Sequence, residues 1–130
     1  MMVAFEPGHR LTVVKNVSLA EDHLHDHFAY QPIMPASLML EGMAQTAGVL
    51  VGSTRGFKEK VILAKIGSAT IDADVIPGQT IRYDAVIERV DESGAAQKAL
   101  FPALITVLAC GRTLGPRKLC SATLTTIAAA

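Results

Sequence analysis

LMLEGMAQTAGVLV, residues 38–51, is the stretch that decides the fold. Nine of its fourteen residues are apolar, and at helical spacing they spread around most of the circumference instead of forming one stripe. A helix that is apolar on nearly all sides is expected to be buried on nearly all sides. In a chain of 130 residues, the simplest way to bury such a helix is to curl a β-sheet around it.

The sequence outside this helix predicts strands separated by turns. IRYDAVIERV, residues 81–90, alternates clearly, with Ile81 and Tyr83 on one face and Arg82 on the other. A short helical turn is expected over 20–26, because Ser18 and Glu21 have capping-box spacing. The predicted strands cover 3–6, 9–17, 61–71, 80–90, 103–110 and 118–127, and the long helix covers about 37–53.

We therefore predict one α+β domain over residues 1–130, in which a curved antiparallel sheet wraps one long central helix. The prolines between residues 27 and 36 predict a loop directly before this helix. Turns are expected at Pro7–Gly8, Pro77–Gly78, Glu92–Gly94 and Leu114–Pro116.

Charge and composition favour some functional classes over others. Twelve basic and twelve acidic residues give a formal net charge of zero, which argues against nucleic acid or an anionic membrane as partner. No secretion signal is visible, and the longest apolar run is too short for a membrane span. Cys110 and Cys120 could face each other across a hairpin, but reduced core cysteines and a cytoplasmic location are the preferred interpretation.

Glu41 is the one carboxylate in the apolar helix, with Gln45 one turn later on the same face. Burying an unpaired carboxylate costs several kcal/mol or forces its protonation. One interpretation lets Glu41 reach solvent through a gap in the sheet. The preferred interpretation makes it a carboxyl group that lines a pocket and can donate a proton.

HLHDHF, residues 23–28, places histidines at every second position ahead of the proline loop. A metal site would need a third converging ligand, which the sequence does not supply nearby, so no metal is expected. His23 and His25 are interpreted as polar surface residues. His27 is the candidate general base, because the loop that follows it leads directly to the helix that carries Glu41.

One longer pattern, H-F-x-x-x-P-I-M-P-x-x-x-x-x-E-x-M-A-Q, covers residues 27–45. Its fixed positions include His27, Phe28, Pro32, Pro35, Glu41 and Gln45. This pattern resembles the signature of the β-hydroxyacyl-acyl carrier protein dehydratases, the FabZ/FabA family with the hot-dog fold. VIPGQTI, residues 75–81, is similar to a second motif of that family, and the resemblance covers most of residues 9–90.

The resemblance implies that the protein converts (3R)-hydroxyacyl thioesters to trans-2-enoyl thioesters. His27 would remove the α-proton and Glu41 would protonate the departing hydroxyl, while the backbone N–H of Ala36 would stabilise the enolate-like oxygen. Phe28, Pro35, Ala36 and Gln45 would contact substrate. No metal or organic cofactor is implied, since the substrate carries its own phosphopantetheine thioester on acyl carrier protein or CoA.

The resemblance also implies a homodimer, and it is compatible with the assembly of three such dimers. The dimer would have a substrate tunnel at its interface and place His27 of one protomer beside Glu41 of the other. Small helix residues would permit close approach of the two long helices: Gly42, Ala44, Ala47 and Gly48.

The sequence departs from the family pattern around the site. Asp26 and Ala36 stand where the family has glycine, and Ala29 stands where it has proline. Asp72 and Asp74 occupy positions at which arginines that bind the carrier protein would be expected. Basic residues that could substitute are Arg55, Lys58, Lys60 and Lys65.

These departures keep two alternatives open. One is a different hot-dog enzyme, such as a thioesterase or an enoyl-CoA hydratase. The other is a non-catalytic hot-dog module that binds acyl thioesters or partner proteins. A pure binding module has no reason to keep both His27 and Glu41, so their joint presence favours the dehydratase.

Overall fold

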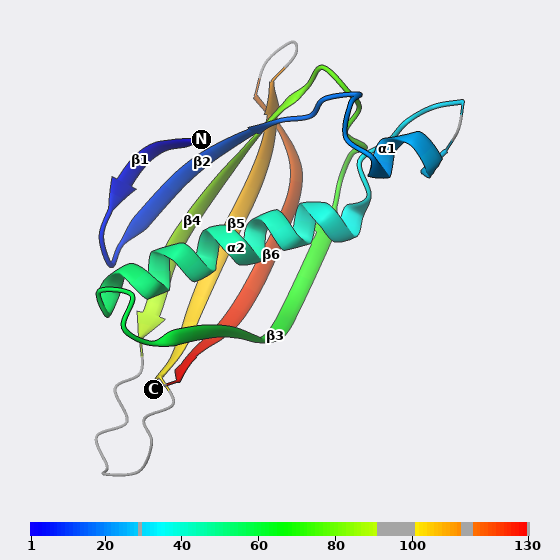
Figure 1. Ribbon diagram of the computed structural model, residues 1–130. Helices are drawn as coiled ribbons and strands as arrows, with labels where there is room; N and C mark the ends of the chain where they lie inside the picture. The colour runs from blue at the N-terminus through cyan, green and yellow to red at the C-terminus, as the bar shows by residue number, and fades with distance from the viewer. Residues whose placement is uncertain (29, 91–100, 113–115, 130) are drawn as a thin grey trace.

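The computed structural model describes residues 1–28, 30–90, 101–112 and 116–129 of the chain. One long helix, α2 (Ala36–Thr54), crosses one face of a six-stranded sheet, and a short helix, α1 (His23–Asp26), lies beyond one end of it (Figure 1). The strands are β1 (Met2–Glu6), β2 (Arg10–Asn16), β3 (Lys60–Ile71), β4 (Thr80–Val90), β5 (Phe101–Arg112) and β6 (Pro116–Ala129).

All strand pairs are antiparallel, and the strand order is β1-β2-β4-β5-β6-β3. The sheet therefore has β1 at one edge and β3 at the other. Every strand predicted from the sequence is present, and most bounds agree to within two residues. The α+β prediction is confirmed.

Two of the four predicted turns fall within the described residues and are present. Gly78 has a φ of +88°, and the backbone N–H of Gln79 donates to the carbonyl of Ile76. Gly8 has a φ of +73° in the turn between β1 and β2. Both glycines follow a proline, as expected for turns that need a positive φ at their third residue. The turns predicted at 92–94 and 114–116 lie largely outside the described residues.

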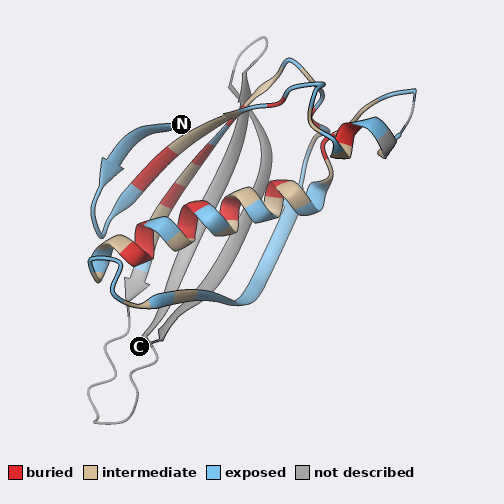
Figure 2. Cartoon of the chain, in the orientation of Figure 1, coloured by how far each residue is buried: buried red, intermediate tan, exposed pale blue. Residues whose placement is uncertain are grey.

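One side of α2 packs on the sheet, and the opposite side is open (Figure 2). The prediction that this helix is buried on nearly all sides is therefore wrong for the single chain. The sheet covers the helix from one side only, so four residues along the outer face remain exposed: Ser37, Glu41, Gln45 and Val49. The buried side of the helix is formed by Met39, Met43, Thr46, Ala47, Leu50, Val51 and Gly52.

Gly42 allows α2 to approach β4 closely. A Cβ atom at this position would lie 2.7 Å from both Cζ and the hydroxyl oxygen of Tyr83, which is a buried core residue. Ala47 is also fully buried against the sheet. Of the small residues proposed for a helix–helix contact, Gly48 has open space beside it, because nothing lies within 4 Å of a Cβ built at this position.

The alternation predicted for β4 is confirmed. Ile81, Tyr83 and Ala85 are buried beneath α2. On the other face, Asp84 accepts hydrogen bonds from Thr12 at 2.6 Å and from Arg82 at 3.0 Å.

Asp84 also forms a salt bridge with Arg10 at 3.3 Å. Burial raises the pKa of the Asp84 carboxyl group, but the hydrogen bonds from Thr12 and Arg82 and the nearby positive charges outweigh it. The pKa of Asp84 therefore lies below its ordinary value.

Two further sequence-based predictions concern cysteines and membranes. The register of β5 and β6 pairs Cys110 with Lys118 and Cys120 with Ala109, so the cysteines are not directly opposite each other. Their side chains lie outside the described part of the structure. Among the described residues, no helix has the length and apolar character needed to cross a membrane.

Candidate active site

His27 follows the last residue of α1 and is held by a backbone carbonyl. Its Nδ1 lies 2.8 Å from the carbonyl oxygen of Ile33. Because a carbonyl oxygen only accepts, Nδ1 carries the proton of the neutral ring and Nε2 keeps the lone pair. The half-buried imidazole is thereby prepared to act as a base through Nε2.

Phe28 adopts a backbone conformation that is rare for its residue type. Its φ is +60°, in the left-handed region, at a cost of about 1–3 kcal/mol. Its carbonyl accepts a hydrogen bond from the N–H of Gln31, and its ring meets the imidazole of His27 edge-on with centroids 4.4 Å apart. These contacts fix the point at which the chain leaves α1 and turns into the proline loop.

The proline loop is attached to the segment before β4. The N–H of Met34 donates to the carbonyl of Val75 at 2.7 Å. Pro35 then precedes α2, and its carbonyl accepts from the N–H groups of Leu38 and Met39. The N-cap residue Pro35 makes no side-chain hydrogen bond to this helix end, at which Ala36 is the first helical residue.

A pocket of about 230 Å³ joins these elements. Three of the predicted site residues line it, namely His27, Phe28 and Ala36. Asp74 also lines it, although the sequence suggested for this residue only the loss of a carrier contact. The remaining walls are apolar and come from Ile33, Met34, Met39, Ile71 and Ala73.

Glu41 and Gln45 lie outside this pocket. Both are exposed on the outer face of α2, and Gln45 Nε2 donates to Glu41 Oε1 at 2.9 Å, as their spacing predicted. The buried, pocket-lining position predicted for Glu41 is therefore wrong for the single chain, because the sheet leaves this face of the helix uncovered. Pro35 adjoins the His27 pocket through Ala36 but does not line it.

Gln45 lines a different crevice, of about 330 Å³, between α2 and β2. Its helix wall also includes Gly42, Thr46 and Val49. The other residues that form it are mainly apolar: Met1, Met2, Leu11, Val13, Val14, Lys15 and Tyr83.

The other two histidines of HLHDHF do not share the surroundings of His27. His25 is exposed, and Nε2 of His23 lies 3.8 Å from Oε2 of Glu21. Within the described part of the chain, no three His, Cys, Asp or Glu residues are grouped in a way that could hold a metal ion.

Glu21 anchors the segment that leads into α1. Its carboxylate accepts hydrogen bonds from Lys15 Nζ at 2.7 Å and from the backbone N–H of Ser18 at 2.9 Å. The bond from Ser18 is one of the two hydrogen bonds that define the predicted capping box. Burial raises the pKa of Glu21, but the hydrogen bonds from Lys15 and Ser18 and the charges of Lys15 and His23 outweigh it, so its pKa is lowered.

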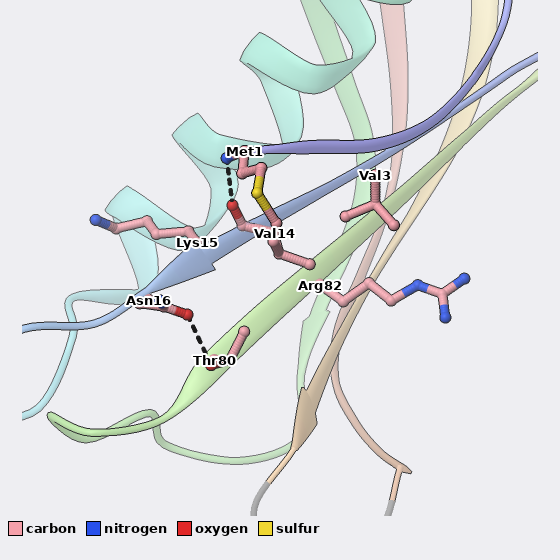
Figure 3. Close-up of a pocket in the computed structure, with 7 residues that line it drawn as sticks. All are labelled: Met1, Val3, Val14, Lys15, Asn16, Thr80 and Arg82. Carbon is pink, nitrogen blue, oxygen red and sulfur yellow. Dashed lines mark hydrogen bonds between the residues drawn. The ribbon is translucent and has the colours of Figure 1, made fainter.

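A larger pocket, of about 620 Å³, contains none of the predicted site residues (Figure 3). Four of its lining residues form two cross-strand pairs, Val14 with Arg82 and Asn16 with Thr80. Along β4, Thr80 and Arg82 alternate with the buried residues Ile81 and Tyr83. This pocket therefore opens on the face of the sheet that points away from α2. Arg82 is engaged by Asp84, so this pocket offers no acid–base pair comparable to the His27 site.

A family model for the FabA-like domain matches residues 2–108. The chain belongs to the FabA-like family. The 3-hydroxyacyl-acyl-carrier-protein dehydratase FabZ of Listeria welshimeri is 32% identical over 105 residues, which cover 80% of this chain and 72% of the relative. FabZ of Clostridium tetani is 35% identical over 92 residues, covering 70% of this chain and 63% of that relative.

Solved structures with a similar fold bind or act on acyl-CoA. The protein smu.793 of Streptococcus mutans, bound to acetyl CoA, superposes with a TM-score of 0.72 at 16% identity, covering 98% of this chain and 86% of that one. An acyl-CoA hydrolase of Staphylococcus aureus, in complex with butyryl coenzyme A, superposes with a TM-score of 0.70 at 15% identity. The match covers 92% of this chain and 65% of that chain. At these identities the likeness shows the fold alone, which is the hot-dog fold.

Sequence reasoning missed two features of this FabA-like site. The carbonyl that orients His27 belongs to Ile33, whose side chain gives no hint of this role. Asp74 reaches the pocket because the segment before β4 is attached to the proline loop through Val75. The V-x-P-G motif that follows Asp74 was the only available signal that this segment lies near the site.

Proposed function

We propose that this FabA-like protein is a dehydratase that converts (3R)-hydroxyacyl thioesters to trans-2-enoyl thioesters. His27 of one protomer acts as the base, and Glu41 of a second copy acts as the acid. The observation that carries the proposal is the hydrogen bond from His27 Nδ1 to the Ile33 carbonyl inside a pocket that adjoins the start of α2. Dehydration of a β-hydroxyacyl thioester requires this type of base beside a stabiliser of negative charge.

The reaction balances with these groups. Nε2 of His27 takes the proton from C2 of the acyl chain, and the electron pair of that C–H bond moves toward the thioester carbonyl. Glu41 then donates its proton to the hydroxyl group on C3, and the C3–O bond breaks. The products are a C2–C3 double bond and water, and proton exchange with solvent restores His27 and Glu41.

The start of α2 supports the charge that develops on the thioester oxygen. The N–H of Ala36 is among the groups that an α-helix leaves without an intrahelical acceptor, and Ala36 lines the pocket. The positive end of the helix dipole adds to this stabilisation. Alanine in place of the family's glycine keeps this N–H, so the donor is retained.

A second copy is needed because one chain does not bring base and acid together. Glu41 is five residues after Ala36, about 7–8 Å further along the helix axis, and it is exposed. Gly48, two turns later on the same side of the helix, leaves room for a neighbouring helix. A two-fold dimer with its long helices side by side would place Glu41 of each copy at the His27 pocket of the other.

The same arrangement suggests where the substrate lies. Phe28 would contact the substrate at the pocket, and Gln45, bonded to Glu41, would direct the acyl chain toward the apolar crevice beside α2. The phosphopantetheine arm of acyl carrier protein or CoA would enter from solvent, and no further cofactor takes part. A cytoplasmic place in fatty acid or related lipid biosynthesis fits this chemistry.

The test is to incubate the purified protein with 3-hydroxyacyl thioesters of several lengths, on carrier protein and on CoA. Formation of the enoyl thioester, followed by its absorbance, supports the proposal. The reverse reaction, hydration of the enoyl thioester, should proceed with the same substrates. Absence of dehydration, hydration and thioester hydrolysis on every substrate would leave the binding module as the better interpretation.

Thioester hydrolysis is a second candidate, favoured by one observation. Asp74 shares the His27 pocket within a single chain, whereas Glu41 does not. A carboxylate and an imidazole could activate water for attack on the thioester carbonyl, with release of the thiol. The same incubations decide between the two reactions, because hydrolysis releases free thiol and dehydration does not.

A further inference from the structure

The crevice between α2 and β2, of about 330 Å³, lies beside the proposed acid. Gln45 lines this crevice, and its Nε2 donates a hydrogen bond to Oε1 of Glu41 at 2.9 Å. A single side chain therefore connects the crevice to the carboxylate that the proposed reaction uses. The volume is within the range of small-molecule pockets in proteins, about 300–1,000 Å³.

The polar side chains of Gln45, Thr46 and Lys15, which all line the crevice, are already engaged. Oγ1 of Thr46 donates to the carbonyl of Gly42 at 2.7 Å, and Nζ of Lys15 donates to Oε2 of Glu21 at 2.7 Å. With its charge held at Glu21, Lys15 offers the crevice mainly the apolar stem of its side chain. The other lining residues are mainly apolar, so a hydrocarbon fits this crevice better than a group that needs new hydrogen bonds.

The helix wall of the crevice sets its length. It extends from Gly42 to Val49, which at a rise of 1.5 Å per residue is about 10 Å along α2. C–C bonds of about 1.5 Å advance an extended hydrocarbon chain by about 1.25 Å each, so about eight carbons cover this distance. The crevice therefore matches the tail of a medium-length acyl chain.

Tyr83 and Val13 belong to the wall that faces the helix. They are partners in the antiparallel pairing of β2 with β4, and both line the crevice. A Cβ atom built at Gly42 would lie 2.7 Å from Cζ of Tyr83, so the buried ring closes the crevice beneath this part of the helix. The smaller side chains of Val13 and Val49 leave the remaining space open, and their size decides how long a tail can enter.

Met1 and Met2 border the crevice on the side of β1. The amine of Met1 donates to the carbonyl of Val14 at 2.7 Å (Figure 3), and Met2 pairs with Val13. Methionine side chains are unbranched and flexible, so this border adapts to the shape of an apolar tail. The branched side chains of Val13 and Val49 are stiffer, and they are therefore the residues that impose a limit.

We propose that this crevice binds the tail of the acyl chain and that Val13 and Val49 limit its length, so that the preferred substrates carry medium-length acyl chains. The inference rests on the proposed function, because C2 and C3 would lie between His27 of one copy and Glu41 of the other. The tail then passes Gln45 and enters the crevice of the copy that supplies Glu41. With about eight tail carbons beyond C3, the preferred acyl chains have about ten to twelve carbons.

Binding of unreactive acyl chains tests the proposal without turnover. Acyl-pantetheine amides of about four to sixteen carbons, in which nitrogen replaces the thioester sulfur and C3 carries no hydroxyl group, are titrated by calorimetry. Each added methylene should lower the dissociation constant up to about fourfold, until the chain reaches about twelve carbons and the constant levels off. A constant that does not change with length, or that continues to fall through the longest probe, would overturn the proposal.

Changing the two valines should move this limit. Val49→Phe should weaken binding of the twelve-carbon probe roughly tenfold relative to that of the four-carbon probe, because it removes room for one or two methylenes. Val13→Ala should move the limit toward longer chains. The control is Val3→Phe, which makes the same change as Val49→Phe but in the pocket on the other face of the sheet, and should leave the length profile unchanged. Circular dichroism checks folding, and an unchanged profile in both folded crevice variants would contradict the proposal.

The position of the tail can be mapped in the parent protein, even if a variant does not fold. The protein is irradiated with a twelve-carbon amide that carries a diazirine at its terminal carbon, and labelled peptides are identified by mass spectrometry. Labels should lie within residues 1–15, 42–49 or 81–85, and labelling confined to other segments, such as those of the His27 pocket, would overturn the proposal. Failure of the proposed reaction is reported separately by turnover assays. A protein that binds the probes with the expected length profile but forms no enoyl thioester would keep this acyl site and lose the dehydratase assignment.

Discussion

Nδ1 of His27 donates a hydrogen bond to the backbone carbonyl of Ile33 at 2.8 Å. This bond fixes the orientation of the ring and leaves Nε2 as the basic nitrogen. Ile33 belongs to the proline loop, which a second hydrogen bond, from Met34 to Val75, attaches to the segment before β4. The base is therefore held by the backbone of the proline loop, which is itself attached to the segment before β4.

The first prediction concerns the base and the acid. His27→Ala and Glu41→Gln should each lower turnover roughly 10²–10⁴-fold, because each removes a proton-transfer group from the reaction. Glu41→Gln should leave the free energy of unfolding nearly unchanged, since Glu41 is exposed in the single chain. Steady-state kinetics and urea denaturation of the same preparations provide both measurements.

His25→Ala is the matched control, because His25 is exposed and lies two residues from His27. It should retain most of the parent's turnover. If His27→Ala or Glu41→Gln lowered stability but left turnover intact, the assignment of base and acid would be wrong.

The second prediction concerns the contact between α2 and β4. Gly42→Ala would place a Cβ atom 2.7 Å from the ring of buried Tyr83, so the helix or the ring must shift. We expect the free energy of unfolding to fall by about 1–3 kcal/mol, as for other overpacked cores. Urea denaturation of dilute protein measures the change.

Gly48→Ala provides the comparison, since a Cβ atom there meets nothing within 4 Å in the single chain. In dilute protein this substitution should raise the free energy of unfolding by up to about 1 kcal/mol, because alanine favours the helical backbone. Equal effects of the two substitutions would mean that Tyr83 does not restrict Gly42.

The third prediction concerns the pH dependence of stability. The pKa of Asp84 is lowered in the folded protein, so its ionised form stabilises the fold at every pH above its ordinary unfolded-state value of about 3.9. This contribution is lost as the pH falls through the lower, folded-state pKa. Asp84→Asn should therefore lower the free energy of unfolding by about 1 kcal/mol at neutral pH.

The difference between the parent and Asp84→Asn should shrink as the pH falls below about 4, where the carboxyl group of the parent becomes protonated. Denaturation series at several pH values measure this difference. A difference that stayed constant down to about pH 3 would show that ionisation of Asp84 does not contribute to stability.

The order and type of the elements could be predicted from the sequence because the local signals agree with one another. The alternation in β4 and the Pro77–Gly78 turn each matched the structure. The burial of α2 could not be predicted correctly, because composition shows how apolar a helix is and not which chain covers each side. The outer face of α2, which exposes Ser37, Glu41, Gln45 and Val49 in the single chain, was therefore assigned to the core of its own domain.

The candidate site was predictable only in part. The resemblance to the dehydratase family implies that His27 and Ala36 belong to one site, and both residues line the same pocket. The role of the Ile33 carbonyl depends on backbone geometry, and the position of Asp74 depends on a long-range hydrogen bond. The first is not encoded in any local residue pattern, and for the second the V-x-P-G motif after Asp74 indicated only that this segment lies near the site.

The most direct test of the shared site is complementation between two inactive variants, His27→Ala and Glu41→Ala. Each variant alone lacks one group in every site. If the two are unfolded together and refolded at equal ratio, about half of the dimers should be mixed. In a mixed dimer one site carries both substitutions and the other site carries neither.

The measurement is the turnover of this refolded mixture relative to refolded parent protein. We predict that about a quarter of all sites regain activity, given unbiased pairing and independent sites. A site built within one protomer would give no recovery, because every protomer lacks either His27 or Glu41. Activity that stays at background in a mixture shown to contain mixed dimers would contradict a site shared between two copies.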